Sequence, residues 1–81
     1  ANLRVLNNRE LHALGLRNGV MITGFTGDKL RELGIEEGFI ITHIDRNPVT
    51  KPDDITFYLE QSQRGVIIAG IYPNGQKASY G

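Results

Sequence analysis

Apolar residues recur along this chain at two spacings, one typical of strands and one typical of helices. Some stretches alternate polar with apolar residues, and others are runs of β-branched residues. Both patterns are typical of strands, and they predict strands at 2–6, 20–23, 39–42, 66–72 and 77–80. Leucine pairs three residues apart predict short helices at 11–14 and 30–33. Ile55, Tyr58 and Leu59 form the stripe of a longer helix. The expected order is strand, helix, strand, helix, strand, turn, longer helix and two strands.

One phrase of this pattern is written twice. Leu-x-x-Leu-Gly-(Leu/Ile)-x-x-Gly-x-x-Ile-Thr begins at Leu11 and again at Leu30. In each copy a glycine, Gly15 or Gly34, directly follows the leucine pair and supplies the left-handed residue that ends a helix. Two copies are too few for a solenoid. We therefore expect two similar pieces of one mixed domain, each a short helix, a turn and a strand.

Turn and cap residues separate these segments. Asn7-Asn8 can cap the first helix, and Thr50 with Asp53 approximates a capping box for the longer one. Residues 45–48 and Asn74-Gly75 predict turns. The fold class that we expect is α+β, a partly open barrel of five or six short, mainly antiparallel strands with one capping helix.

Length and composition narrow the functional classes. The 81 residues have room for one domain, 1–81, and the ends at Ala1 and Gly81 suggest a module excised from a longer chain. Nine basic and nine acidic residues cancel, so no electrostatic footprint for nucleic acid is expected. There is no cysteine, which excludes disulfides and thiolate metal sites. No apolar run is long enough to span a membrane.

Residues that could carry chemistry do not form a recognisable group. His12 and His43 have no acidic partners at a metal-ligand spacing. Neither Ser62 nor Ser79 lies in a nucleophile elbow. We expect no catalytic residues, no metal and no cofactor. The remaining candidate for a binding site is the backbone of the strand Asn2–Leu6. Its free edge can accept another strand beside the helix that carries Ile55, Tyr58 and Leu59.

Two phrases carry a family resemblance. Residues 27–44 (GDKLRELGIEEGFIITHI) and Asn47-Pro48-Val49 followed by Asp53-Asp54-Ile55 resemble a PDZ domain of the bacterial HtrA/Deg serine protease type, in particular its second, C-terminal PDZ. The resemblance extends over essentially the whole chain, and the strand order matches the circularly permuted bacterial form. Phe39 replaces the family's aspartate, which implies an added apolar contact, and Ala1 stands where the family's carboxylate-binding loop ends.

The resemblance implies a non-catalytic, peptide-binding regulatory module of an envelope protease, with a periplasmic location. A hydrophobic peptide C-terminus, or a segment of an unfolded protein, would add to the edge strand and place its last side chain beside the longer helix. The expected binding residues are Ala1, Asn2, Leu3, Arg4, Val5, Leu6, Ile55, Tyr58 and Leu59.

Other functions remain open. The same fold could be an assembly module that docks the protease domain or a sister PDZ of the oligomer without binding free C-termini. A fragment of a membrane-embedded site-two protease is a third alternative, for which the sequence contains no transmembrane segment.

Overall fold

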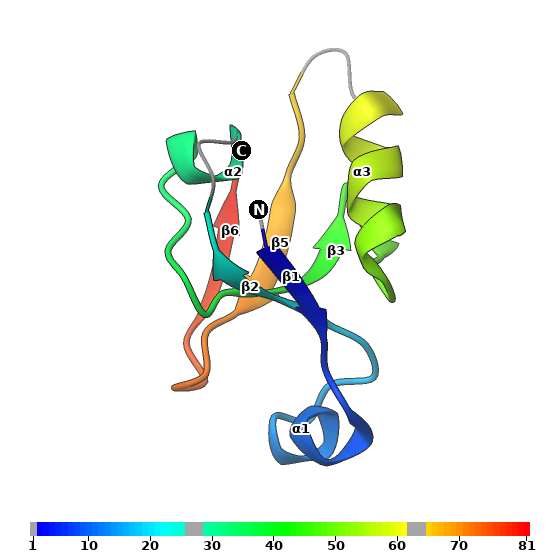
Figure 1. The fold of residues 1–81 in the computed structure, drawn as a ribbon, viewed down its shortest axis with the longest axis vertical. Coiled ribbons are helices and arrows are strands. Elements are labelled where there is room, and N and C mark those ends of the chain that lie inside the picture. The colour runs from blue at the N-terminus through cyan, green and yellow to red at the C-terminus, as the bar shows by residue number, and fades with distance from the viewer. Residues whose placement is uncertain (1, 26–28, 62–64) are drawn as a thin grey trace.

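The computed structural model describes residues 2–25, 29–61 and 65–81. Helices and strands alternate in the expected order, which confirms the α+β class (Figure 1). Their bounds are β1 Asn2–Val5, α1 Asn8–Ala13, β2 Val20–Gly24, α2 Lys29–Glu32, β3 Ile40–Ile44, β4 Asn47–Pro48, α3 Pro52–Gln61, β5 Ile68–Ile71 and β6 Lys77–Tyr80.

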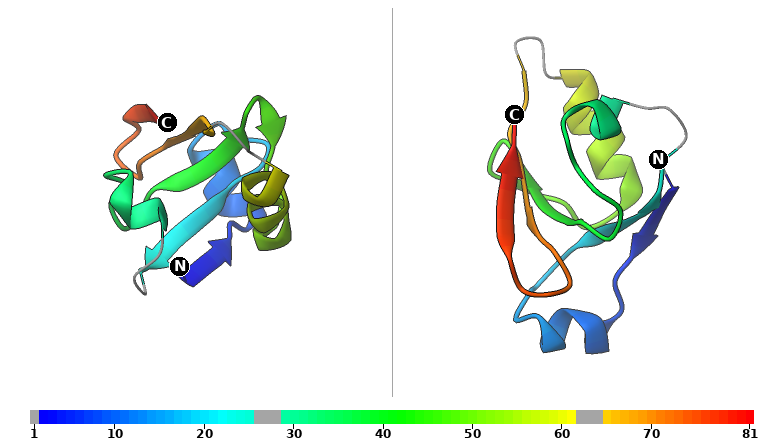
Figure 2. Two further views of the ribbon diagram at one scale, coloured as in Figure 1. Left: turned by 90° about the horizontal axis from the view of Figure 1, so that it is seen from above. Right: turned by 90° about the vertical axis from the view of Figure 1, so that its left-hand side faces the viewer.

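All the strands belong to one open, antiparallel sheet. Its main path is β1-β2-β3-β5-β6, with β1 and β6 at its two ends, and the short strand β4 pairs with β3 off this path. β2 pairs with the first half of β3, at Ile40 and Ile41, and β4 pairs with the second half, at His43 and Ile44. β5 pairs along the other side of β3. Seen from above in Figure 2, the sheet curls, with α3 beside β1.

The inner face of the sheet carries the main core. α2 and α3 cover this face, and α1 lies at the opposite end of the long axis (Figure 1). Phe39 replaces the aspartate of the resembling family and is fully buried, with its ring centroid 4.8 Å from that of Tyr72 and 5.3 Å from that of Tyr80. The added apolar contact is therefore present. The buried residues of the main core are Val20, Ile22, Leu30, Ile35, Phe39, Ile41, Ile44, Val49, Ile55 and Ile68.

The outer face carries a second, smaller group that we call the outer cluster. It consists of Leu6, Ile40 and Ile71, and the residues packed against it are Leu11, Leu14, Leu16 and Met21. Neighbouring residues of a strand point to opposite faces, so Ile40 enters the outer cluster and Ile41 enters the main core. The short helix α1 thus covers only one end of the outer face.

A β-bulge interrupts β3. Ile41 pairs with Gly70 and His43 pairs with Ala69, so Thr42 is one residue more than β5 can match. Thr42 is buried, and its hydroxyl donates to the Ala69 carbonyl at 3.2 Å. At Gly70 the two backbones approach so closely that a Cβ atom would lie 1.9 Å from the Ile40 carbonyl oxygen. Glycine is therefore required there.

Both helix-ending glycines have the expected left-handed conformation, Gly15 with φ 68° and Gly34 with φ 91°. The turn at 45–48 is shorter than predicted. Only Asp45 and Arg46 form it, with φ 50° and 72°, while Asn47-Pro48 pairs with β3 as β4. A two-residue hairpin turn of type I′ has both central residues at positive φ, as Asp45 and Arg46 have here, so the turn is complete without Asn47 and Pro48.

Other boundaries and one cap also differ from prediction. Strand β1 ends at Val5, β2 ends at Gly24, β3 covers Ile40–Ile44, and β5 covers only Ile68–Ile71. Helix α1 begins three residues earlier than predicted, at Asn8, and α2 one residue earlier, at Lys29. The Thr50 hydroxyl and backbone N–H both donate to the Asp54 carboxylate at 2.9 Å. The capping carboxylate of α3 is therefore Asp54 and not Asp53.

Candidate functional site

The edge strand β1 is the first part of the predicted site. Among the described residues it pairs only with β2, with Leu3 opposite Ile22 and Val5 opposite Val20. Leu3 is half-buried and packs against the main core. Val5 keeps 49% of its surface exposed. The other edge of β1 therefore has no strand partner in the described part of the chain.

Helix α3 is the second part. Cα atoms of α3 come within 8 Å of Cα atoms of β1, and the two elements lie side by side (Figure 2). Ile55 is 3% exposed and belongs to the main core, and Tyr58 and Leu59 are half-buried against it. The structure thus brings Leu3 together with all three predicted residues of the helix.

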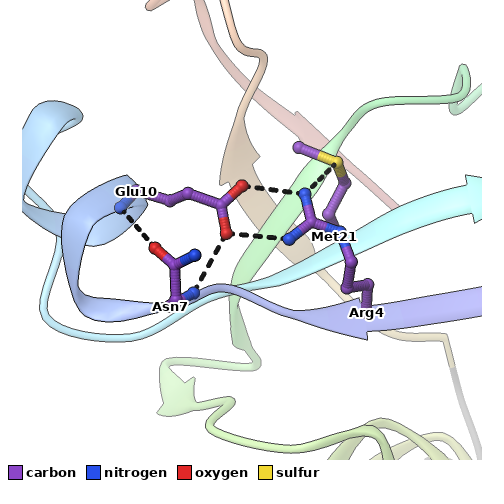
Figure 3. Close-up of polar contacts among 4 residues, drawn as sticks. All are labelled: Arg4, Asn7, Glu10 and Met21. Atoms are coloured by element: carbon purple, nitrogen blue, oxygen red, sulfur yellow. Dashed lines mark hydrogen bonds and ion pairs between the residues drawn. The ribbon is translucent and has the colours of Figure 1, made fainter.

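Leu6 and Arg4 lie elsewhere. Leu6 is 4% exposed in the outer cluster, and its N–H donates to the Gly19 carbonyl at 3.2 Å. Arg4 points to the outer face, where its guanidinium donates to both carboxylate oxygens of Glu10 at 2.8 Å and contacts the Met21 sulfur at 3.6 Å (Figure 3). Asn2 is exposed at the start of β1, and Ala1 lies outside the described residues.

Glu10 also caps the helix to which it belongs. Asn7 accepts from the Glu10 N–H at 2.9 Å, and Glu10 accepts from the Asn7 N–H at 3.0 Å (Figure 3). The Arg4 guanidinium, followed by the Asn7 N–H, lowers the pKa of Glu10 from 4.5 to about 2. Glu10 in turn raises the pKa of Arg4. Because its guanidinium donates to both carboxylate oxygens of Glu10, Arg4 connects β1 to α1.

A depression lies between α2 and α3, and we call it the α2–α3 depression. Its volume is about 710 Å³. Of the predicted site residues that the structure describes, Leu59 alone lines it. The sequence-based prediction missed the others, although the leucine pair of the repeated phrase could have indicated part of the set. The lining residues are Leu30, Glu32, Leu33, Thr56, Leu59, Glu60, Gly65 and Val66.

This lining can receive an apolar side chain. Thr56 and Leu59 lie on one face of α3 because they are three residues apart, and Leu30 of α2 and Leu33 directly after α2 line the other side. The charged residues among these lining positions are both acidic, Glu32 and Glu60. A carboxylate placed in the depression would therefore meet like charge.

The described residues contain no arrangement for metal or nucleophilic chemistry. No three His, Asp or Glu side chains gather to hold a metal in that part of the chain. His43 Nδ1 lies 3.0 Å from Thr42 Oγ1. Strand β5 separates His43 from Ser79, so these two residues are about two strand spacings, or 9–10 Å, apart. Ser62 lies outside the described residues.

The chain matches no protein-family model, no curated protein and no solved structure. Within residues 2–25, 29–61 and 65–81, no helix has the length and apolar character needed to cross a bilayer. The candidate site therefore has to be interpreted from its own geometry.

Proposed function

We propose that this chain is a non-catalytic peptide-binding module of the PDZ type. An extended hydrophobic C-terminal segment adds to the free edge of β1, and its last apolar side chain enters the α2–α3 depression. The observation that carries the proposal is the edge strand β1, which in the described part of the chain pairs with β2 alone and has α3 beside it. Strand addition of this kind gives affinity through backbone hydrogen bonds and selection through a side-chain pocket.

The element order and the resemblance support the finer assignment. Permuted strand order, a capping helix and an open sheet are what an HtrA-type PDZ requires, and the observed order β1, α1, β2, α2, β3, β4, α3, β5, β6 is compatible with it. In this proposal the parent protein is a periplasmic serine endopeptidase whose catalytic residues lie in another domain. Isolated interactions of this kind have affinities near 1 μM, or about −8 kcal/mol.

One observation favours the second candidate, assembly. Glu32 and Glu60 line the depression, and a free terminal carboxylate near them would be repelled. An internal segment of a sister domain or of the protease domain carries no terminal charge. The groove would then hold a fixed subunit and not a free C-terminus.

A titration with paired peptides separates these functions. We would add one valine-ending hydrophobic peptide as free acid and as C-terminal amide and follow the backbone amide NMR shifts. Under the first function, only the acid shifts the signals of β1 and α3. Under the assembly function, neither form does, or both do equally. Shifts confined to other elements would contradict strand addition on β1.

Val5→Lys supplies the matched variant. A lysine there keeps β1 in place but puts a charge beside the proposed ligand, so binding should weaken about tenfold. Ile67→Lys is the control because Ile67 is also an exposed apolar residue, 60% exposed, just before β5. Equal binding by the folded Val5→Lys variant and the wild type would rule out the β1 groove.

A further inference from the structure

The outer face of the sheet is only partly covered. Ile44 and Ile68 point into the main core, so the neighbouring His43 and Ala69 point outward. Register places His43 opposite Ala69 and Ala69 opposite Ser79, which gives one row across β3, β5 and β6. The outer cluster under α1 ends at Ile40 and Ile71 and leaves this row open.

Two depressions meet along this row. The first, of about 720 Å³, lies between the loop that follows α1 and strand β6, with Arg17 and Lys77 in its lining. The second, of about 580 Å³, has Arg46 and Ile67 in its lining. Both are lined by His43 and Ala69, so they form one continuous surface that we call the outer groove.

The charges along the outer groove are mainly of one sign. Arg17, Arg46 and Lys77 line it and make no ion pair with any described residue. Asp45 is the acidic residue in the described lining, and its Oδ1 accepts a hydrogen bond from the Ile67 N–H at 2.9 Å. Since the whole chain has no net charge, this excess of positive charge is local.

The groove also offers apolar surface. Ile67 keeps 60% of its surface exposed, and the small residues Ala69 and Gly70 leave the sheet accessible between the charged ends. No Phe, Tyr or Trp belongs to the described lining, so the His43 imidazole is the one ring among those residues on which a nucleic-acid base could stack. These features fit a protein segment better than a nucleic acid.

We propose that the outer groove binds an extended acidic protein segment. Its carboxylates pair with Arg17 and Lys77 at one end and with Arg46 at the other, and an aliphatic side chain between them covers Ile67. The groove lies on the outer face, whereas α3 packs against the inner face through Ile55, so this site is separate from the β1 groove and does not depend on the function proposed above.

The test uses a peptide without free ends, acetyl-EELEE-amide, with acetyl-KKLKK-amide as its charge-reversed control. We expect the acidic peptide to shift the amide signals of Arg17, His43, Ala69 and Lys77 and to leave those of β1 and α3 unchanged. Its affinity should fall as salt is raised from about 20 to 200 mM, because exposed ion pairs are screened over a Debye length. The basic peptide should not bind.

Two charge-matched double variants decide whether the groove itself is responsible. Arg17→Glu with Lys77→Glu should weaken binding at least about tenfold. Arg9→Glu with Arg31→Glu changes the net charge equally on exposed sites outside the groove and should leave Kd within about twofold. If the first pair does not fold, Arg17→Gln with Lys77→Gln replaces it.

Several results would overturn the proposal. They are equal weakening in both double variants, shifts confined to β1 and α3, and no binding at low salt. A single-stranded oligothymidine that binds the same residues more tightly than the acidic peptide would also overturn it, because the site would then be one for nucleic acid.

Discussion

Glu10 accepts hydrogen bonds from two different elements. Its carboxylate binds the Asn7 N–H at the start of α1 and the Arg4 guanidinium of β1. Exposed ion pairs contribute little energy on their own because water and salt screen them. The value of this contact is geometric, since it fixes the direction in which the chain leaves β1 and enters α1.

The low pKa of Glu10 makes stability depend on pH. The folded-state pKa of about 2 lies below the ordinary 4.5, so the stabilising contribution is present above about pH 4.5 and is lost as pH falls towards 2. We expect Glu10→Gln to lower the thermal midpoint more at about pH 6 than at about pH 2. Glu37→Gln, at an exposed residue of the turn before β3, should show no such difference. An equal effect of Glu10→Gln at both pH values would contradict the assignment.

Gly70 is a second residue at which one contact determines the residue type. In Gly70→Ala the new methyl group would lie 1.9 Å from the Ile40 carbonyl oxygen, which belongs to the backbone and cannot turn away. Overpacking commonly costs about 1–3 kcal/mol, and we expect a loss in free energy of unfolding at or above the top of that range. Urea denaturation measures it.

Gly24→Ala is the control for this loss. Its new methyl would meet only the Asn2 side-chain amide, 3.2 Å away on an exposed residue that can move. A similar loss in the two variants would mean that the β3–β5 approach is not what requires Gly70.

At the scale of elements, the repeated phrase builds two units with opposite roles. In the first copy Leu11, Leu14 and Leu16 pack against the outer cluster. In the second copy Leu30 and Ile35 are buried in the main core, and Leu33 packs against it. The two copies of this local sequence therefore cover opposite faces of one sheet. The copy before β2 packs on the outer face, and the copy before β3 packs on the inner face.

The hairpin between β3 and β4 contains a residue in an unfavourable backbone conformation. Arg46 has φ 72°, a left-handed conformation that costs a residue with a Cβ about 1–2 kcal/mol. Arg46→Gly should therefore raise the free energy of unfolding by about 1 kcal/mol. The same change in a helix, Arg9→Gly in α1, should lower it by about 0.5–1 kcal/mol. Chemical denaturation of the two variants tests the opposite signs, and a destabilised Arg46→Gly would show that this turn is not strained.

At the scale of the molecule, the sequence predicted the order of elements and much of the core. Spacing of apolar residues reports which face of an element is buried, so the helix-ending glycines and the inward stripe of Ile55, Tyr58 and Leu59 were confirmed. The α2–α3 depression was missed for the most part. Its walls come from two helices, and no local pattern states which helices meet.

Strand pairing across the sheet also could not be predicted from local sequence patterns. The sequence suggests that residues 2–6 form one strand with a single role, but Arg4 binds Glu10 and Leu6 joins the outer cluster. Asn7-x-x-Glu10 could have been identified as a capping box, since its spacing is local. The outer groove could not, because Arg17, His43 and Lys77 meet only through the register of three strands and one loop.

The bulge at Thr42 has a consequence for insertions and deletions. Strand side chains alternate with a period of two, so the extra residue acts as a phase shift that lets Ile41 face inward while His43 faces outward. If β3 kept Thr42 but paired regularly, its second half would be inverted, with the imidazole directed into the core and Ile44 into water. Deleting Thr42 would instead remove the bulge and keep His43 outward and Ile44 inward. The bulge is therefore the place in β3 where the loss of one residue leaves the inward and outward faces unchanged, and alignments of related chains should show any single-residue gap of this strand here.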